Sequence, residues 1–319
     1  GMSLNLIGDQ RDLPPTDPVK PLAKTIVSGT KNGLTFEVTG WEDRPATSSG
    51  VSNSDTFTMR VIELAISSKE ATHLLAADSA IRLHLPTSCG DLAVPLSPLT
   101  RSIPYGWRGS AQLVPNEKSR VRLVFLLPTA IAGRISGTVS WRTSDLDALL
   151  PLGDKAPDHA PPAHTARGNG FECRINRVFH KAEEPNPLYV DVTVKRNLDG
   201  TVGVFEPGLL AKIEGESIEL SAQSGNRLFS FGPTRHLEPG EEVRGLYIFE
   251  AEGDKVSLVS DLLRLDWPTP VTLLPADEEW LTHDRPEYPE EKSPDLEDGR
   301  IRSLARQAAG TKQQPPPQK

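Results

Sequence analysis

Three side chains that lie close together in the sequence have the types that bind zinc. Asp158, His159 and His164 lie in the segment DHAPPAH, and two imidazoles with one carboxylate are a ligand set that zinc accepts. The prolines around them provide no folded surroundings that would hold the imidazoles in place. We therefore expect solvated side chains, no bound metal and no other cofactor, with these three residues as the metal candidates.

The motifs of the common enzyme classes do not occur in the sequence. No G-x-S-x-G segment is present, so no serine stands on the strained turn that such hydrolases need. ARGNGFECR carries Gly168 and Gly170 but lacks the third glycine of a dinucleotide-binding loop, and it opens a strand where that loop opens a helix. Acidic pairs such as Glu183 and Glu184 are adjacent residues of expected loops, where solvated charge is the ordinary state. These observations favour a protein without enzymatic activity.

One segment has the composition of a ligand-binding loop. SIPYGWRGS presents Tyr105 and Trp107, which we expect to be exposed, together with Arg108, and the three could hold a ligand by stacking and hydrogen bonding. Aromatic residues make up 6% of the chain, so a carbohydrate platform would have to be built from few side chains. The alternative, which we favour, is that the aromatic rings pack in the core or in an interface.

Charge and cysteine content exclude several classes of protein. The 319-residue chain has a formal net charge of -8 and no concentrated face of lysine and arginine, so neither nucleic acid nor an anionic membrane surface is an expected partner. No stretch approaches the ~20 apolar residues of a membrane-spanning helix, so we expect no insertion into a membrane. Cys89 and Cys173 cannot form a four-cysteine zinc site, and we expect two free thiols.

Proline placement divides the chain, because proline interrupts both strands and helices. Prolines gather near the start, in PLGDKAPDHAPPAH, and in the last part, which ends in KQQPPPQK. Within that last part, acidic residues followed by arginines predict a short helix near 295–309, with a solvated disordered segment as the alternative. The expected organisation is an extended N-terminal arm (1–27), a first β-sandwich domain (28–146), a Pro-rich linker (147–164), a second β-sandwich domain (165–275) and a charged, Pro-rich tail (276–319).

The two long blocks resemble each other in three places, in the same order, which indicates a tandem duplication. Short alternating segments at close turn spacing predict an all-β fold, with an antiparallel two-sheet sandwich in each block. In the first block the alternation shifts phase after Val61, which a bulge near that residue would explain. The matched segments are NGLTFEVTGW (32–41) with NGFECRINRV (169–178), DTFTMRVIELAI (55–66) with NPLYVDVTVKRN (186–197), and LVPNEKSRVRLVFLLP (113–128) with LEPGEEVRGLYIFEAE (237–252).

The second block contains LYVDVTVKRN, LLAKIEGESIEL, LEPGEEVRGLYIFE and SLVSDLLRLDW, in that order. With these segments it resembles the immunoglobulin-like domains of unknown function found in bacterial exported proteins and lipoproteins. The resemblance covers about residues 171–267, and the first block repeats it more faintly. It implies two tandem immunoglobulin-like antiparallel β-sandwich domains with a mostly irregular C-terminal tail, and it carries over no catalytic residues.

The expected function is that of a non-enzymatic binding or scaffold protein. We expect a protein partner, contacted through sheet edges or end loops at the bacterial cell envelope. The first residues lack a basic and an apolar region, so a location in the periplasm or envelope requires a signal that has been removed upstream. Without such a signal the expected location is the cytoplasm. The alternative function is a glycan-binding accessory module or a hydrolase whose site is built from loops.

Overall fold

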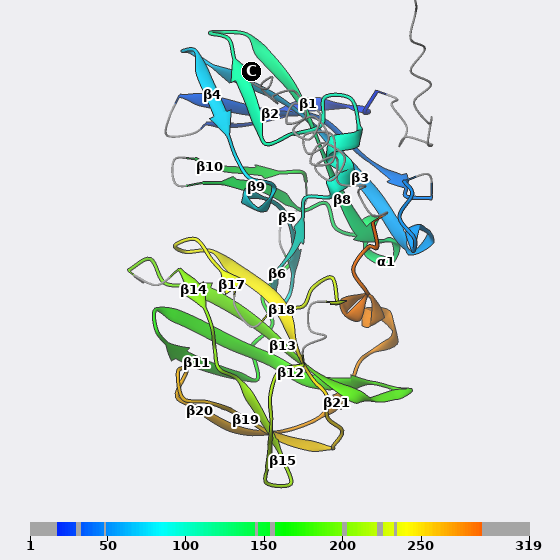
Figure 1. Cartoon of the computed structure of the whole chain (residues 1–319), viewed down its shortest axis with the longest axis vertical. Helices are drawn as coiled ribbons and strands as arrows, with labels where there is room; N and C mark the ends of the chain where they lie inside the picture. Colours follow the sequence, from blue (N-terminus) through cyan, green and yellow to red (C-terminus); the bar gives the residue numbers. More distant parts are fainter. Residues whose placement is uncertain are drawn as a thin grey trace, which may run out of the picture.

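The computed structural model describes most of the chain, and that part is mostly β (Figure 1). The expectation of a fold made mainly of β-strands is confirmed. The 3₁₀ segments η1 (Ser54–Thr56), η2 (Asp78–Ala80), η3 (Pro98–Ser102) and η5 (Ala276–Thr282) and the single turn of α1 (Thr129–Ala132) are short. The described residues are 18–29, 33–47, 49–143, 146–153, 157–199, 203–221, 226–232 and 235–288.

The first half of the chain forms two four-stranded arrangements and a ribbon. One sheet has the order β1-β2-β3-β8, the second group has the order β10-β9-β5-β6, and β4 pairs with β7. The bounds are β1 Pro21–Gly29, β2 Leu34–Pro45, β3 Phe57–Ser68, β4 Thr72–Leu75, β5 Ile81–Thr87, β6 Gly90–Pro95, β7 Ser110–Leu113, β8 Lys118–Pro128, β9 Thr138–Arg142 and β10 Asp147–Pro151.

The second half repeats this pairing order strand for strand. Its groups are β11-β12-β13-β18, β20-β19-β15-β16 and β14-β17, so that β11 to β20 stand in the places of β1 to β10. The bounds are β11 His164–Gly168, β12 Phe171–Lys181, β13 Glu184–Arg196, β14 Val204–Phe205, β15 Leu210–Ile213, β16 Glu216–Ile218, β17 Arg235–His236, β18 Glu242–Phe249, β19 Lys255–Ser260, β20 Leu265–Pro270 and the added β21 Thr272–Leu273.

The three matched pairs of sequence segments all form strands at equivalent places, β2 with β12, β3 with β13 and β8 with β18. The ARGNGFECR segment is the turn between β11 and β12. Gly168 pairs with Phe171, and both residues between them have positive φ, 50° at Asn169 and 82° at Gly170. Asparagine followed by glycine adopts this two-residue hairpin turn readily, because both tolerate the left-handed region.

The two halves share one sheet. The outer edge of β6 lies beside β18, with Leu92 bridging Arg244 in a parallel sense, and this joins the two groups into a nine-stranded mixed sheet that includes β21. Figure 1 shows β6 running from the first half down to β18 and β13 of the second. The relative position of the halves is therefore set by backbone pairing as well as by side chains.

Two apolar clusters form the cores. The second cluster lies between the sheets of the second half and is made of its own residues, such as Val192, Tyr247 and Leu258. The first cluster fills the first half and continues across the junction to Phe179, Tyr189 and other residues of the second half. Burial of apolar surface thus stabilises the contact between the halves.

A C-terminal strap, residues 274–288, holds the first half against the second. Leu281 of η5 is completely buried in the first core, and the ring of His283 lies 4.6 Å from that of Phe57. The backbone of Glu287 accepts a hydrogen bond from Ser52 at 3.0 Å, and Glu278 pairs with Arg177. The strap begins after β20 and β21 of the second half, so it ties two distant parts of the chain together.

Several segments that sequence assigned to irregular regions are folded. Residues 276–288, expected in the tail, form the strap because Leu281 finds an apolar pocket. Residues 147–151, expected in the linker, form β10, in which Ala148 and Leu150 alternate inward. Residues 21–27, expected in the arm, belong to β1. Proline was taken as a break at the ends of β1 and β10, but the end of a strand accepts proline.

The bulge expected near Val61 is also misplaced. The pairing of β3 with β8 is continuous, and the irregular register lies instead in β2, between Val38 and Gly40. Val61 and Ile62 therefore point to opposite faces of the sheet, and both are buried because each face is covered along part of β3.

Part of what the sequence predicts lies outside the described residues. This holds for the helix near 295–309 and for residues 1–17 of the arm. Among the described residues, no helix is both long and apolar enough to span a membrane.

Candidate functional site

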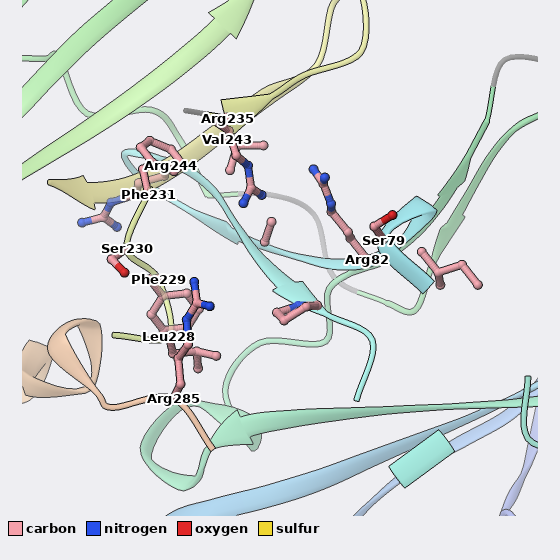
Figure 2. Close-up of a pocket in the computed structure, with 13 residues that line it drawn as sticks. Ser79, Arg82, Leu228, Phe229, Ser230, Phe231, Arg235, Val243, Arg244 and Arg285 are labelled. Atoms are coloured by element: carbon pink, nitrogen blue, oxygen red, sulfur yellow. The ribbon is translucent and has the colours of Figure 1, made fainter. Parts of the chain in front are cut away.

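A cavity of about 250 Å³ opens where the halves meet, and three segments line it. The first half contributes Arg82 and its neighbours in β5 and β6, the second contributes residues 228–231 with β17 and β18, and the strap contributes Arg285. Figure 2 shows the guanidinium groups of Arg235 and Arg285 directed into this space, with the side chain of Arg82 extending along another side of it. A site of this kind exists only when the halves are held together.

Arg235 is the least compensated of these side chains. Its guanidinium forms no hydrogen bond or ion pair with any residue that the structure describes, and its Nε is buried without a partner. Burial, followed by the positive charge of Arg82, lowers the pKa of Arg235 to about 10, while Glu241 acts in the opposite direction and Arg285 adds to the lowering. The ring of Phe231 lies 5.7 Å from its guanidinium carbon.

The other arginines differ in how they are paired. Arg82 contacts Glu241 at 3.2 Å, so part of its charge is neutralised. Arg285 donates its Nε to the carbonyl of Arg227 at 3.1 Å, and its side chain is exposed. No aspartate or glutamate is among the described residues that line this cavity. The cavity therefore has an excess of positive charge inside a chain that is acidic overall.

Arg244 also borders the cavity but has a structural role. Its guanidinium points away from the other three in Figure 2 and binds the fully buried Asp191 through two contacts of 2.9 and 2.6 Å. It also donates to Thr87 Oγ1 of the first half at 2.9 Å. A buried charge needs this pairing, and the third contact ties the halves together.

Residues 229–231, which form the apolar wall of the cavity, are the counterpart in the second half of the aromatic loop of residues 105–107. Phe231 donates its backbone N–H to Leu246, and Leu246 donates to Phe229. In the first half, Trp107 donates to Arg122, and Arg122 donates to Tyr105. Residues 229–231 thus repeat residues 105–107. The sequence match of 113–128 with 237–252 has the same spacing between the halves, so it could have identified residues 229–231 as the counterpart of 105–107.

The exposure expected for Trp107 is wrong. Its side chain is 2% exposed, its Nε1 donates to the carbonyl of Ala76 at 3.2 Å, and its ring lies 4.7 Å from that of Trp141. The indole packs at the edge of the core, because burying its large apolar surface is more favourable than exposing it to water. Tyr105 is 57% exposed with the guanidinium of Arg120 4.7 Å from its ring, and Arg108 is exposed.

The metal candidates are not brought together. Asp158 and His159 are exposed, whereas His164 lies in β11 and stacks on Trp267 with ring centroids 5.1 Å apart. No group of three potential metal ligands occurs in the described part of the chain. Cys173 is buried, which raises its pKa to about 12, and both cysteines are free thiols here.

A serine and histidine pair that the sequence did not indicate lies on β5 and β9 of the first half. His84 Nε2 and Ser140 Oγ are 2.7 Å apart on neighbouring strands, and both side chains are buried. Burial lowers the pKa of His84 to about 4, although Glu241 acts in the opposite direction. A histidine with so low a pKa is a weak general base, so this pair reads as a structural hydrogen bond. Only strand pairing brings the two residues together, which spacing along the chain could not reveal.

A free sheet edge is the second feature of interest. Among the described strands, β16 pairs only with β15, and it occupies in the second half the place that β6 occupies in the first. The hairpins align through their two-residue turns, so that Ile218 corresponds to Leu92, the residue that bridges Arg244. The equivalent edge in the first half is thus already used to bind a strand.

Comparisons with protein-family models, with curated proteins and with solved structures found nothing that matches this chain.

Proposed function

We propose that this protein is a non-enzymatic binding or scaffold protein, built of two tandem immunoglobulin-like sandwiches, that binds a partner protein at the bacterial cell envelope. The identical pairing order of β1 to β10 and β11 to β20 supports the duplication. The resemblance of residues 171–267 to domains of bacterial exported proteins supports the envelope.

The free edge of β16 carries the proposal. An unpaired strand edge offers N–H and C=O groups to an incoming strand, which is a common mode of partner recognition. The chain shows such an edge in use, since β6 receives β18. A partner strand would add to β16 in the same way, at the end of the second half remote from the junction, where Figure 1 shows β15.

The absence of enzymatic activity is part of the proposal. The serine and histidine pair of Ser140 and His84 supports it, because a weakly basic imidazole does not activate a hydroxyl. The alternative is a glycan-binding platform. Trp107 is buried and could not contact a glycan there, which leaves Tyr105 and Arg108 as the exposed candidates.

The test is site-specific photocrosslinking with the full chain in its source cells. A photoreactive residue at Ser217, which is exposed in β16, should cross-link one partner protein, whereas the same residue at Lys118, 61% exposed in β8, should not. The purified partner should bind the unmodified protein, and Ser217→Pro should weaken binding at least about tenfold, because the register of β16 with β15 places the N–H of Ser217 on the free edge.

Two results would contradict the proposal. Cross-linking to the same proteins from Ser217 and Lys118 would show that β16 has no special role. Cross-linking of Ser217 to a second copy of this chain would replace a partner protein with self-assembly.

A further inference from the structure

We propose that the cavity at the junction is a binding site for a small organic oxyanion, a carboxylate or a phosphate ester with a small apolar body, held by Arg235 and Arg285. This inference goes beyond the proposed function and does not depend on β16. The cavity lies at the opposite end of the second half from that edge, and different residues line it.

The charge of the cavity determines the class of ligand. Arg82 is partly neutralised by Glu241 at 3.2 Å, which leaves Arg235 and Arg285 without an acidic partner among the described residues of the lining. Guanidinium groups bind carboxylate and phosphate oxygens through paired hydrogen bonds, and such charge-assisted bonds are the strong ones. Two uncompensated guanidiniums favour a ligand with two negative charges.

The state of Arg235 indicates that a partner is missing. A buried polar atom without a hydrogen bond costs free energy, and a buried charge costs more. Arg235 combines a buried Nε that has no partner with a half-buried guanidinium whose charge is partly desolvated beside Arg82. An oxyanion in the cavity would accept from this guanidinium and offset the cost.

The remaining walls limit the size and character of the ligand. Phe229 and Phe231 are buried and present apolar surface to the cavity, and Leu228 and Val243 extend it. The volume of about 250 Å³ lies slightly below the range typical of drug-sized ligands. A small organic anion with an apolar body and one or two oxyanion groups fits these limits.

The primary test compares Arg235→Met with unmodified protein, using phosphate and succinate as probes at constant ionic strength. In unmodified protein both thermal unfolding and calorimetry should report binding of at least one probe. Arg235→Met should raise the melting temperature without anion, because it removes a half-buried charge and a buried Nε without a partner, and it should weaken binding at least about tenfold. Arg285→Gln should weaken binding without raising the melting temperature.

The matched control is Arg167→Gln, in which an arginine that is 74% exposed and pairs with Glu172 is neutralised. It should leave anion binding unchanged. An equal change in anion affinity in all variants would show a general effect of salt and would overturn the proposal of a specific site. A lower melting temperature of Arg235→Met without anion would show that Arg235 is a structural residue, and that would also overturn the proposal.

A final arm distinguishes a free ligand from carboxylates of this chain. Glu290 and Glu291 follow the strap in sequence, and both are changed to glutamine in the full chain. Unchanged probe affinity supports a free ligand. Tighter probe binding in this variant would show that these carboxylates compete for the arginines, and it would overturn the free ligand in favour of an internal occupant.

Discussion

His84 shows how burial decides the charge of a single residue. Its pKa falls from about 6.5 to about 4 on folding, mainly because burial disfavours the imidazolium. The unfolded chain therefore binds a proton at a pH where the folded chain does not. The free energy of unfolding therefore has its full value above about pH 6.5. It falls as the pH drops toward 4, by roughly 3 kcal/mol in total.

The measurement is urea unfolding of the unmodified protein and of His84→Gln between pH 4 and pH 7. Glutamine can still hydrogen-bond to Ser140 but does not titrate, so the variant should lose less stability than the unmodified protein as the pH falls. Carboxylates titrate in both proteins and cancel in the comparison. Identical pH dependence of the two proteins would contradict a neutral buried His84.

Gly106 is a residue whose lack of a side chain permits a close approach. An added Cβ would overlap the carbonyl oxygen of Thr100, whereas one added to Gly133 would meet open space. Gly106→Ala should lower the free energy of unfolding by roughly 1–3 kcal/mol, and Gly133→Ala should change it little. Equal effects of the two substitutions in urea unfolding would show that the loop of residues 105–107 can shift freely.

Single residues were the hardest features to predict from sequence. The segment around Trp107 has the composition of a ligand-binding loop. Whether the Trp107 side chain is buried depends on neighbouring strands, which the local sequence does not reveal. Arg235 and His84 have no motif around them, because strand pairing and the contact between the halves create their surroundings.

At the scale of elements, the strap is a test of how the halves are joined. Leu281 is fully buried in the first core, while Leu273 of β21 is 58% exposed in the preceding segment. Leu281→Ala should cost about 2–5 kcal/mol of stability, and Leu273→Ala should cost less than about 0.5. A small effect of Leu281→Ala in chemical unfolding would mean that the strap does not support the first core.

Elements were easier to predict than residues. The alternation in residues 55–66, 113–128 and 237–252 predicts strands, and all three segments contain strands. Strands were missed where proline was taken as a break, as at the ends of β1 and β10. The strap was missed because its two buried leucines, Leu274 and Leu281, are separated by proline and acidic residues and give no periodic signal.

At the scale of the whole molecule, the duplicated sequence predicts two similar halves, but it does not predict how they meet. The contact uses the β6 edge, the pair of Arg82 with Glu241 and the strap. These are features in which the halves differ in sequence. Each half alone should therefore be less stable than in the full chain, because apolar surface and the partners of these charges would be exposed.

A binding site between the halves requires that they be held in one fixed arrangement, since both line the arginine cavity. The direct measurement is the distance between two spin labels in the full chain, at Leu75→Cys and Lys212→Cys, with Cys89 replaced by serine. Both labelled positions are exposed and lie in different halves. We predict one narrow distance distribution. A broad distribution would show that the halves move independently, and it would contradict a binding site formed between them.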